Sequence, residues 1–184
     1  MRISDLYEAD LDNNIQSLID KSEWKDTPIY RGTSILVDED LDYKIIDIPK
    51  SGYRTKALHT KREVHNLIND VSEQKLGVKV RNGLFCTMNS QHAFEYGDDN
   101  YVLVVPLSSN SVYSARGVDD FTTSMDYDGI YRASRNNDKE SKENFLRLVN
   151  DYVNLIDIRQ PNDPLIGEEE LMIFGKVLLI RVED

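Results

Sequence analysis

Two carboxylates stand two residues apart at the start of an apolar segment near the C-terminus. Residues 167–175 read Gly-Glu-Glu-Glu-Leu-Met-Ile-Phe-Gly, and a second apolar run follows. Short apolar runs of this kind predict strands, here either one bent strand or a hairpin. Because side chains alternate along a strand, Glu168 and Glu170 point to one face and Glu169 to the other. Neighbouring carboxylates repel each other unless a cation approaches, so the pair is either a solvated acidic turn or part of a site for a cationic group.

A single arginine interrupts a short apolar and aromatic segment near residue 30. The segment Ile29-Tyr30-Arg31-Gly32-Thr33 predicts a strand. A guanidinium inside such a strand needs an anion, which is either a carboxylate of this acidic chain or a bound phosphate.

Residues 83–93 combine a strand, polar side chains and the start of a helix. They read Gly-Leu-Phe-Cys-Thr-Met-Asn-Ser-Gln-His-Ala. Asn89 or Ser90 can cap the helix, and Gly97 ends it. A strand that leads through hydroxyl and amide groups into a helix can hold a polar ligand.

In this order, the three segments resemble the motifs of mono-ADP-ribosyltransferases of the arginine–serine–glutamate type, a group that includes phage and binary-toxin enzymes. Tyr30-Arg31-Gly32 is similar to the first motif, residues 83–97 to the second, and residues 168–173 to the third, the Glu-x-Glu motif. The central Ser-Thr-Ser of the family is replaced here by Cys86-Thr87-Met88, which offers one hydroxyl, at Thr87.

The resemblance implies a reaction and a role for each motif. NAD would be the substrate, and ADP-ribose would pass to a protein side chain with release of nicotinamide. Glu170 corresponds to the glutamate that stabilises the oxocarbenium-like ribose. Glu168 corresponds to the residue that orients the acceptor, and a glutamate there implies an arginine acceptor. Thr87 stands where a serine of the family orients the catalytic glutamate and contacts the cofactor.

The resemblance also assigns cofactor contacts, and no metal. Arg31 would pair with a phosphate, Gly32 would let the backbone approach the nicotinamide amide, and Tyr96 would stack on the nicotinamide ring. Each residue has a plain structural alternative. Arg31 could pair with an internal carboxylate, Gly32 could simply end a strand, and Tyr96 could pack at the end of its helix.

The elements that must position these residues are those of one α+β domain over residues 1–184. Apolar spacing and turn residues predict a helical segment within residues 1–25, a strand over 44–48, a helix between a capping box at Thr60 and Gly77, a strand over 101–107 and a helix over 139–155. Residues 108–138 are rich in Ser, Asp, Asn, Gly and Arg and predict long loops with only short regular pieces.

The resemblance refines this expectation. It implies an ADP-ribosyltransferase-like core of two packed, mostly antiparallel sheets with flanking helices and the N-terminal helical segment. The long intervals between the motifs imply an insertion at 108–160.

Charge and composition narrow the class of partner. The net charge is −11 and the pI about 4.7, which disfavours direct binding to nucleic-acid phosphates or anionic membranes. The lone Cys86 excludes an intramolecular disulfide, and three scattered His give no zinc-ligand spacing. With no apolar run of membrane-spanning length and no hydrophobic signal region at the start, we expect a cytoplasmic protein.

The sequence therefore predicts an NAD-dependent mono-ADP-ribosyltransferase, and the resemblance suggests a phage effector that acts on proteins in the host cytoplasm. Two alternatives remain. The same site could hydrolyse NAD without transfer to a protein. The chain could instead be a non-catalytic acidic protein that imitates the charge of DNA and occupies a basic partner.

Overall fold

The structure is a computed structural model that describes residues 13–32, 42–50, 62–97, 100–107, 112–118, 139–161, 163 and 169–182. Its helices are α1 (Asn13–Lys21), α2 (Arg62–Leu76), α3 (Ser90–Tyr96) and α6 (Lys139–Asn154), with a short 3-10 helix η2 (Val80–Asn82). Its strands are β1 (Tyr30–Gly32), β2 (Tyr43–Ile48), β3 (Leu84–Cys86), β4 (Tyr101–Pro106), β5 (Val112–Ala115), β6 (Ile156–Ile158), β7 (Glu170–Ile173) and β8 (Gly175–Arg181). The predicted α+β class is confirmed, and the N-terminal helix is present as α1.

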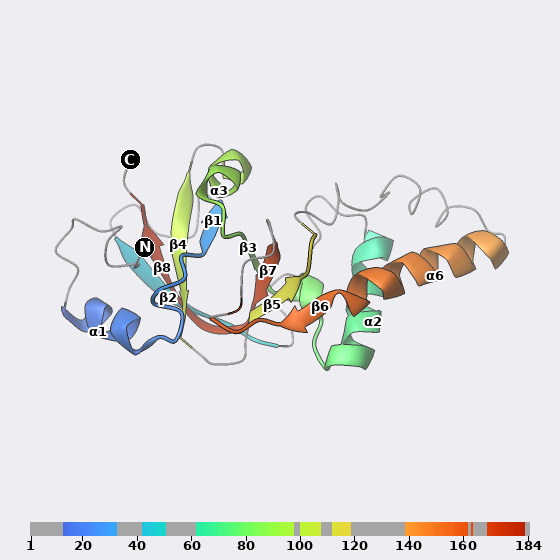
Figure 1. Cartoon of the computed structure of the whole chain (residues 1–184), viewed down its shortest axis with the longest axis horizontal. Coiled ribbons are helices and arrows are strands. Elements are labelled where there is room, and N and C mark those ends of the chain that lie inside the picture. Colours follow the sequence, from blue (N-terminus) through green and yellow to red (C-terminus); the bar gives the residue numbers. More distant parts are fainter. Residues whose placement is uncertain are drawn as a thin grey trace.

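The strands form two four-stranded sheets. The first sheet has the order β1-β4-β8-β2 and the second the order β3-β7-β5-β6. Every strand pairing in the described part of the chain is antiparallel, as expected. Figure 1 shows the first sheet between α1 and α3, and the second sheet leading to α2 and α6 at the other end of the molecule.

Strand β4 is one of the two inner strands of the first sheet, and both of its faces are buried. Val102 and Val104 belong to the larger core cluster, which both sheets share with α2 and α6. Leu103 and Val105 point the other way, into a second cluster with residues of α1 and α3. Burial of both faces explains why this strand reads as a continuous apolar run rather than as an alternating one.

Two helix ends follow the predicted capping signals. Asn89 accepts hydrogen bonds from the backbone N–H groups of Gln91 and His92 at the start of α3. Gly77 ends α2 with a φ of +70°, a left-handed conformation that glycine adopts without a steric penalty. The proposed capping residue Thr60 lies outside the described residues.

The acidic segment leads into a crossover between the two sheets. Strand β7 pairs with β3 and β5, whereas β8 pairs with β4 and β2. The hairpin alternative is therefore wrong, because β7 and β8 belong to different sheets. The chain turns between them at the fully buried Phe174 and at Gly175, which has a φ of +81°.

The stretch predicted as long loops with only short regular pieces contains one such piece, the four-residue strand β5, at an inner position of the second sheet. Strand β5 pairs with both β6 and β7. Strand β6 was not predicted, and the position of β5 within a sheet was not predicted either. Both strands are short, and their pairing partners are distant in the sequence, so tertiary context rather than local pattern decides them. Among the described residues, no helix is long and apolar enough to cross a membrane.

Candidate functional site

The first two motifs meet where the two sheets approach each other. Tyr30 and Thr87 form an antiparallel bridge, with N···O distances of 2.8 and 2.9 Å between their backbones. The bridge lies beyond the end of β3 and joins it to β1. Next to this bridge, the Arg31 side chain donates a hydrogen bond from Nη1 to the Phe85 carbonyl oxygen at 2.5 Å. The second-motif strand therefore contacts the first-motif arginine directly.

Arg31 is half-buried and has no carboxylate partner among the described residues. Its Nε atom is buried and makes no hydrogen bond there. A guanidinium has five N–H donors, and the hydrogen bond from Nη1 to the Phe85 carbonyl uses one of them. Arg31 therefore retains donors for an anion. The internal ion pair that we considered for Arg31 is therefore not formed with any described carboxylate.

Helix α3 packs directly over Gly32. A Cβ atom at this position would collide with the Ala93 carbonyl oxygen and would come within 2.6 Å of the Gly97 nitrogen. The glycine is thus required by the close approach of α3, whatever its contact with a ligand. Tyr96, at the end of α3, is 68% exposed and so does not belong to the core.

Thr87 combines a backbone bridge with a local side-chain contact. Its Oγ1 accepts a hydrogen bond from the Asn89 backbone N–H at 3.1 Å. The hydroxyl hydrogen remains available as a donor. The register of β3 and β7 pairs Phe85 with Met172 and Cys86 with Leu171, so the next two residues along it are Thr87 and Glu170.

Glu170 is held by two residues that sequence reasoning did not identify. Arg81 Nη1 lies 3.3 Å from each carboxylate oxygen, and the Tyr152 hydroxyl donates to Oε2 at 3.2 Å. The side chains of Arg81 and Glu170 are 6% and 13% exposed, so this ion pair is largely withdrawn from water. Arg81 is therefore a cationic partner of Glu170, the described member of the acidic pair, and the ion pairs found among the described residues do not include Arg31.

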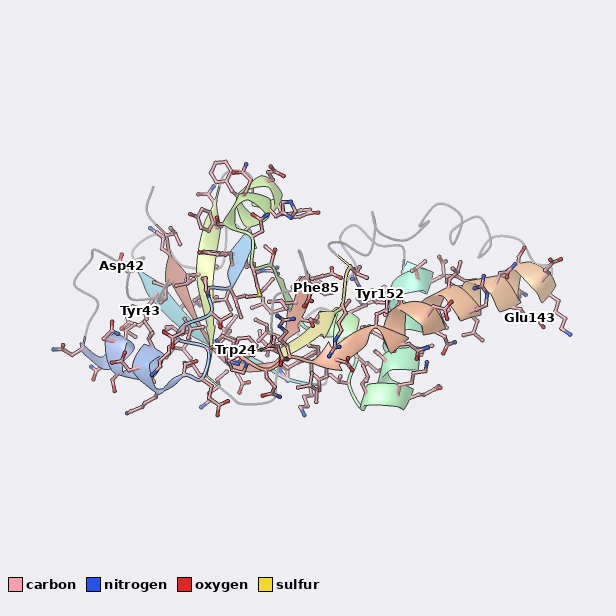
Figure 2. The ribbon with its side chains drawn as sticks, in the orientation of Figure 1. Trp24, Asp42, Tyr43, Phe85, Glu143 and Tyr152 are labelled. Carbon is pink, nitrogen blue, oxygen red and sulfur yellow. The ribbon has the colours of Figure 1, made fainter. Side chains whose placement is uncertain are left out.

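Burial raises the pKa of Tyr152 well above its ordinary value, and the Glu170 carboxylate raises it further, whereas Arg81 lowers it. The hydroxyl therefore stays protonated and acts as the donor toward Glu170. Figure 2 labels Tyr152 on α6 and Phe85 on β3. The Arg81 guanidinium lies over the Phe85 ring, with its carbon atom 4.3 Å from the ring centroid. Phe85 thus contacts one arginine through its carbonyl and another through its ring.

Glu169 has a different partner. Its carboxylate forms a buried ion pair with Arg159 at 2.5 Å, with side chains 0% and 4% exposed. The expectation that Glu169 and Glu170 face different surroundings is confirmed by these separate partners. Glu168, the proposed acceptor residue, lies outside the described residues.

The sequence contains little that could have identified Tyr152 and Arg81 as partners of Glu170. Tyr152 lies seven residues after Phe145 in the predicted helix 139–155, and so on the same face, which indicates burial. Arg81 precedes Glu170 by 89 positions, and nothing local connects them. Among the described residues, no group of three His, Cys, Asp or Glu side chains could hold a metal ion.

Comparison of the chain with models of known protein families, with curated proteins and with solved structures finds no match.

Proposed function

We propose that this protein is an NAD-dependent mono-ADP-ribosyltransferase with a protein side chain, most simply an arginine, as acceptor. The observation that carries the proposal is the state of Arg31. In a chain of net charge −11, this half-buried guanidinium pairs with no described carboxylate and keeps a buried Nε without a hydrogen bond. An arginine left in this state suits the phosphate of a dinucleotide, because a planar guanidinium binds a phosphate with two parallel hydrogen bonds.

The surroundings of Arg31 support the same proposal. The bridge between Tyr30 and Thr87 joins the arginine motif to the hydroxyl motif, and the backbone of Tyr96, the exposed last residue of α3, lies close to Gly32. An exposed aromatic ring on the helix that packs over Gly32 can stack on nicotinamide while Arg31 holds a phosphate. The two antiparallel sheets agree with the ADP-ribosyltransferase-like core that the sequence suggested.

The proposed reaction exchanges one bond at the ribose C1′ atom. The bond between C1′ and the nicotinamide nitrogen breaks, and nicotinamide leaves with the bonding electrons. A nitrogen of the acceptor guanidinium then forms a bond to C1′ and loses one proton. Glu170 stabilises the cationic ribose through its negative charge, Glu168 accepts the acceptor's proton, and Thr87 donates a hydrogen bond.

The test uses NAD labelled in its adenylate part and a bacterial cell lysate. Wild type should label discrete proteins, and hydroxylamine should release the label if the acceptor is arginine. Arg31→Gln should lower labelling and NAD affinity by about tenfold or more, because a charge-assisted bidentate contact is lost. The matched control is Arg116→Gln, since Arg116 is 58% exposed and pairs with Asp157 on the surface.

Each outcome separates the candidates. Nicotinamide release by wild type without labelled protein would assign NAD hydrolysis in place of transfer. Intact NAD with pure, folded wild type would refute the proposal and favour the acidic binding protein. Equal activity of Arg31→Gln and Arg116→Gln would remove Arg31 from the site.

A further inference from the structure

Glu170 is fixed on two sides by residues outside the three motifs. Arg81 contacts both carboxylate oxygens, and Tyr152 donates to one of them. Arg81 comes from η2, and Tyr152 from α6. The carboxylate that we assign to the ribose is thus anchored to two elements that pack on the second sheet.

The arginine is itself immobilised. Its backbone N–H donates to Asn69 Oδ1 on α2 at 2.9 Å, and its guanidinium lies over the Phe85 ring. Asn69 in turn contacts the side chains of His65 and Asn82 at 3.1 and 2.9 Å. A buried polar cluster with several hydrogen bonds of this kind favours one geometry, because a rearrangement would break those bonds, although the Arg81 Nε atom itself is buried without a hydrogen bond.

We propose that Arg81, supported by Tyr152, is the positioning residue of Glu170: it keeps the carboxylate ionised and pointed in one direction. This inference rests on the proposed function of Glu170. Burial alone disfavours a charged carboxylate, whereas a neighbouring guanidinium and a donating hydroxyl favour it. A carboxylate that must stabilise a cationic ribose has to be charged and preoriented before NAD arrives.

Loss of Arg81 and loss of Arg31 should change different kinetic parameters of NAD cleavage. Arg31 is assigned to NAD itself, so its loss should raise the KM for NAD. Arg81 contacts Glu170, so its loss should lower kcat and leave the KM little changed. A purely structural ion pair would change neither parameter in a variant that remains folded.

The experiment measures NAD cleavage by wild type, Arg81→Gln, Arg81→Lys and Tyr152→Phe, with Arg116→Gln as control and circular dichroism as the check on folding. We expect kcat for Arg81→Gln to fall about 10- to 100-fold, since small misplacements of a catalytic group have effects of this size. Arg81→Lys restores the charge without the planar group and should recover part of the rate. Tyr152→Phe retains the arginine and should show a smaller loss.

A second readout does not depend on turnover. The carboxyl carbon of Glu170 can be followed by NMR against pH and assigned by its absence in Glu170→Gln. Its titration midpoint should move to higher pH in Arg81→Gln, because the ionised form loses its cation, and should stay in place in Arg116→Gln.

The outcomes keep the two proposals distinct. If wild type cleaves NAD, a folded Arg81→Gln with the wild-type kcat overturns this inference alone. An unchanged midpoint in Arg81→Gln does the same. If wild type does not cleave NAD, the proposed function fails and the positioning role fails with it.

Discussion

Glu169 and Glu170 are adjacent in the sequence, yet each carboxylate is bound by a different arginine. Arg159 holds Glu169, and Arg81 holds Glu170. Both pairs are largely buried, so neither carboxylate belongs to a solvated acidic turn. The two ion pairs fix the beginning of β7 from two directions, and so determine where the third motif enters the second sheet.

The first prediction concerns the pair of Glu169 and Arg159. Glu169→Ala leaves a buried arginine without its charge partner, and we expect a loss of about 3–5 kcal/mol in the free energy of unfolding. Arg159→Met combined with Glu169→Leu should recover most of that loss, because no buried charge remains. Urea denaturation measures both variants. Equal stability of Glu169→Ala and wild type would show that the pair contributes nothing.

The second prediction concerns Asn69, which accepts from the Arg81 backbone N–H. Asn69→Ala leaves that buried donor unsatisfied and should cost about 1–3 kcal/mol. The Arg81 amide should also exchange its hydrogen faster. The control is Asn150→Ala at a half-buried position of α6, where the side chain donates to the Leu146 carbonyl. Unchanged exchange at Arg81 would contradict the proposed support.

The third prediction compares two glycines with different constraints. Gly32→Ala forces a Cβ atom into the backbone of α3 and should cost about 1–3 kcal/mol or more, since backbone cannot move aside cheaply. Gly77→Ala meets open space and should cost only about 1–2 kcal/mol, for its left-handed conformation. Thermal unfolding of both variants and of wild type measures the two losses of stability. A smaller loss at Gly32 than at Gly77 would show that α3 packs less tightly.

The fourth prediction concerns the thiol of Cys86. Burial raises its pKa to about 12, although the nearby Arg31 charge lowers it in part. Native protein at pH 8 should therefore resist thiol reagents and react only in urea. Rapid labelling of the folded protein would contradict this assignment.

The same shift has a consequence for stability at high pH. The unfolded thiol ionises near pH 9, whereas the folded thiol stays protonated until about pH 12. Stability from this group is complete below pH 9 and is lost between these values, by up to about 1.4 kcal/mol per pH unit. Cys86→Ala should show a shallower decline over that interval in denaturation experiments.

Several local features could be predicted from the sequence. The continuous apolar run of β4, the cap of α3 at Asn89 and the end of α2 at Gly77 each depend on residues within a few positions of one another. Local patterns of this kind have one favourable backbone conformation, so the sequence alone identifies them. The sequence allowed for a short regular piece at β5 but not for its place within a sheet, because its four residues pair with strands that are distant in the sequence.

The sequence by itself determined the order of the three motifs and predicted the opposite directions of neighbouring glutamates, and it left open whether the acidic pair is solvated or meets a cation. Only the tertiary structure shows which arginines bind Glu169 and Glu170. Arg81 reaches Glu170 across 89 positions of sequence, and Arg31, the arginine that the sequence marked, forms no ion pair with it. The physical reason is that the attraction between two charges depends on their distance in space and not on their separation in the sequence. The packing of η2 and α6 against β7 sets the distances from Arg81 and Tyr152 to Glu170.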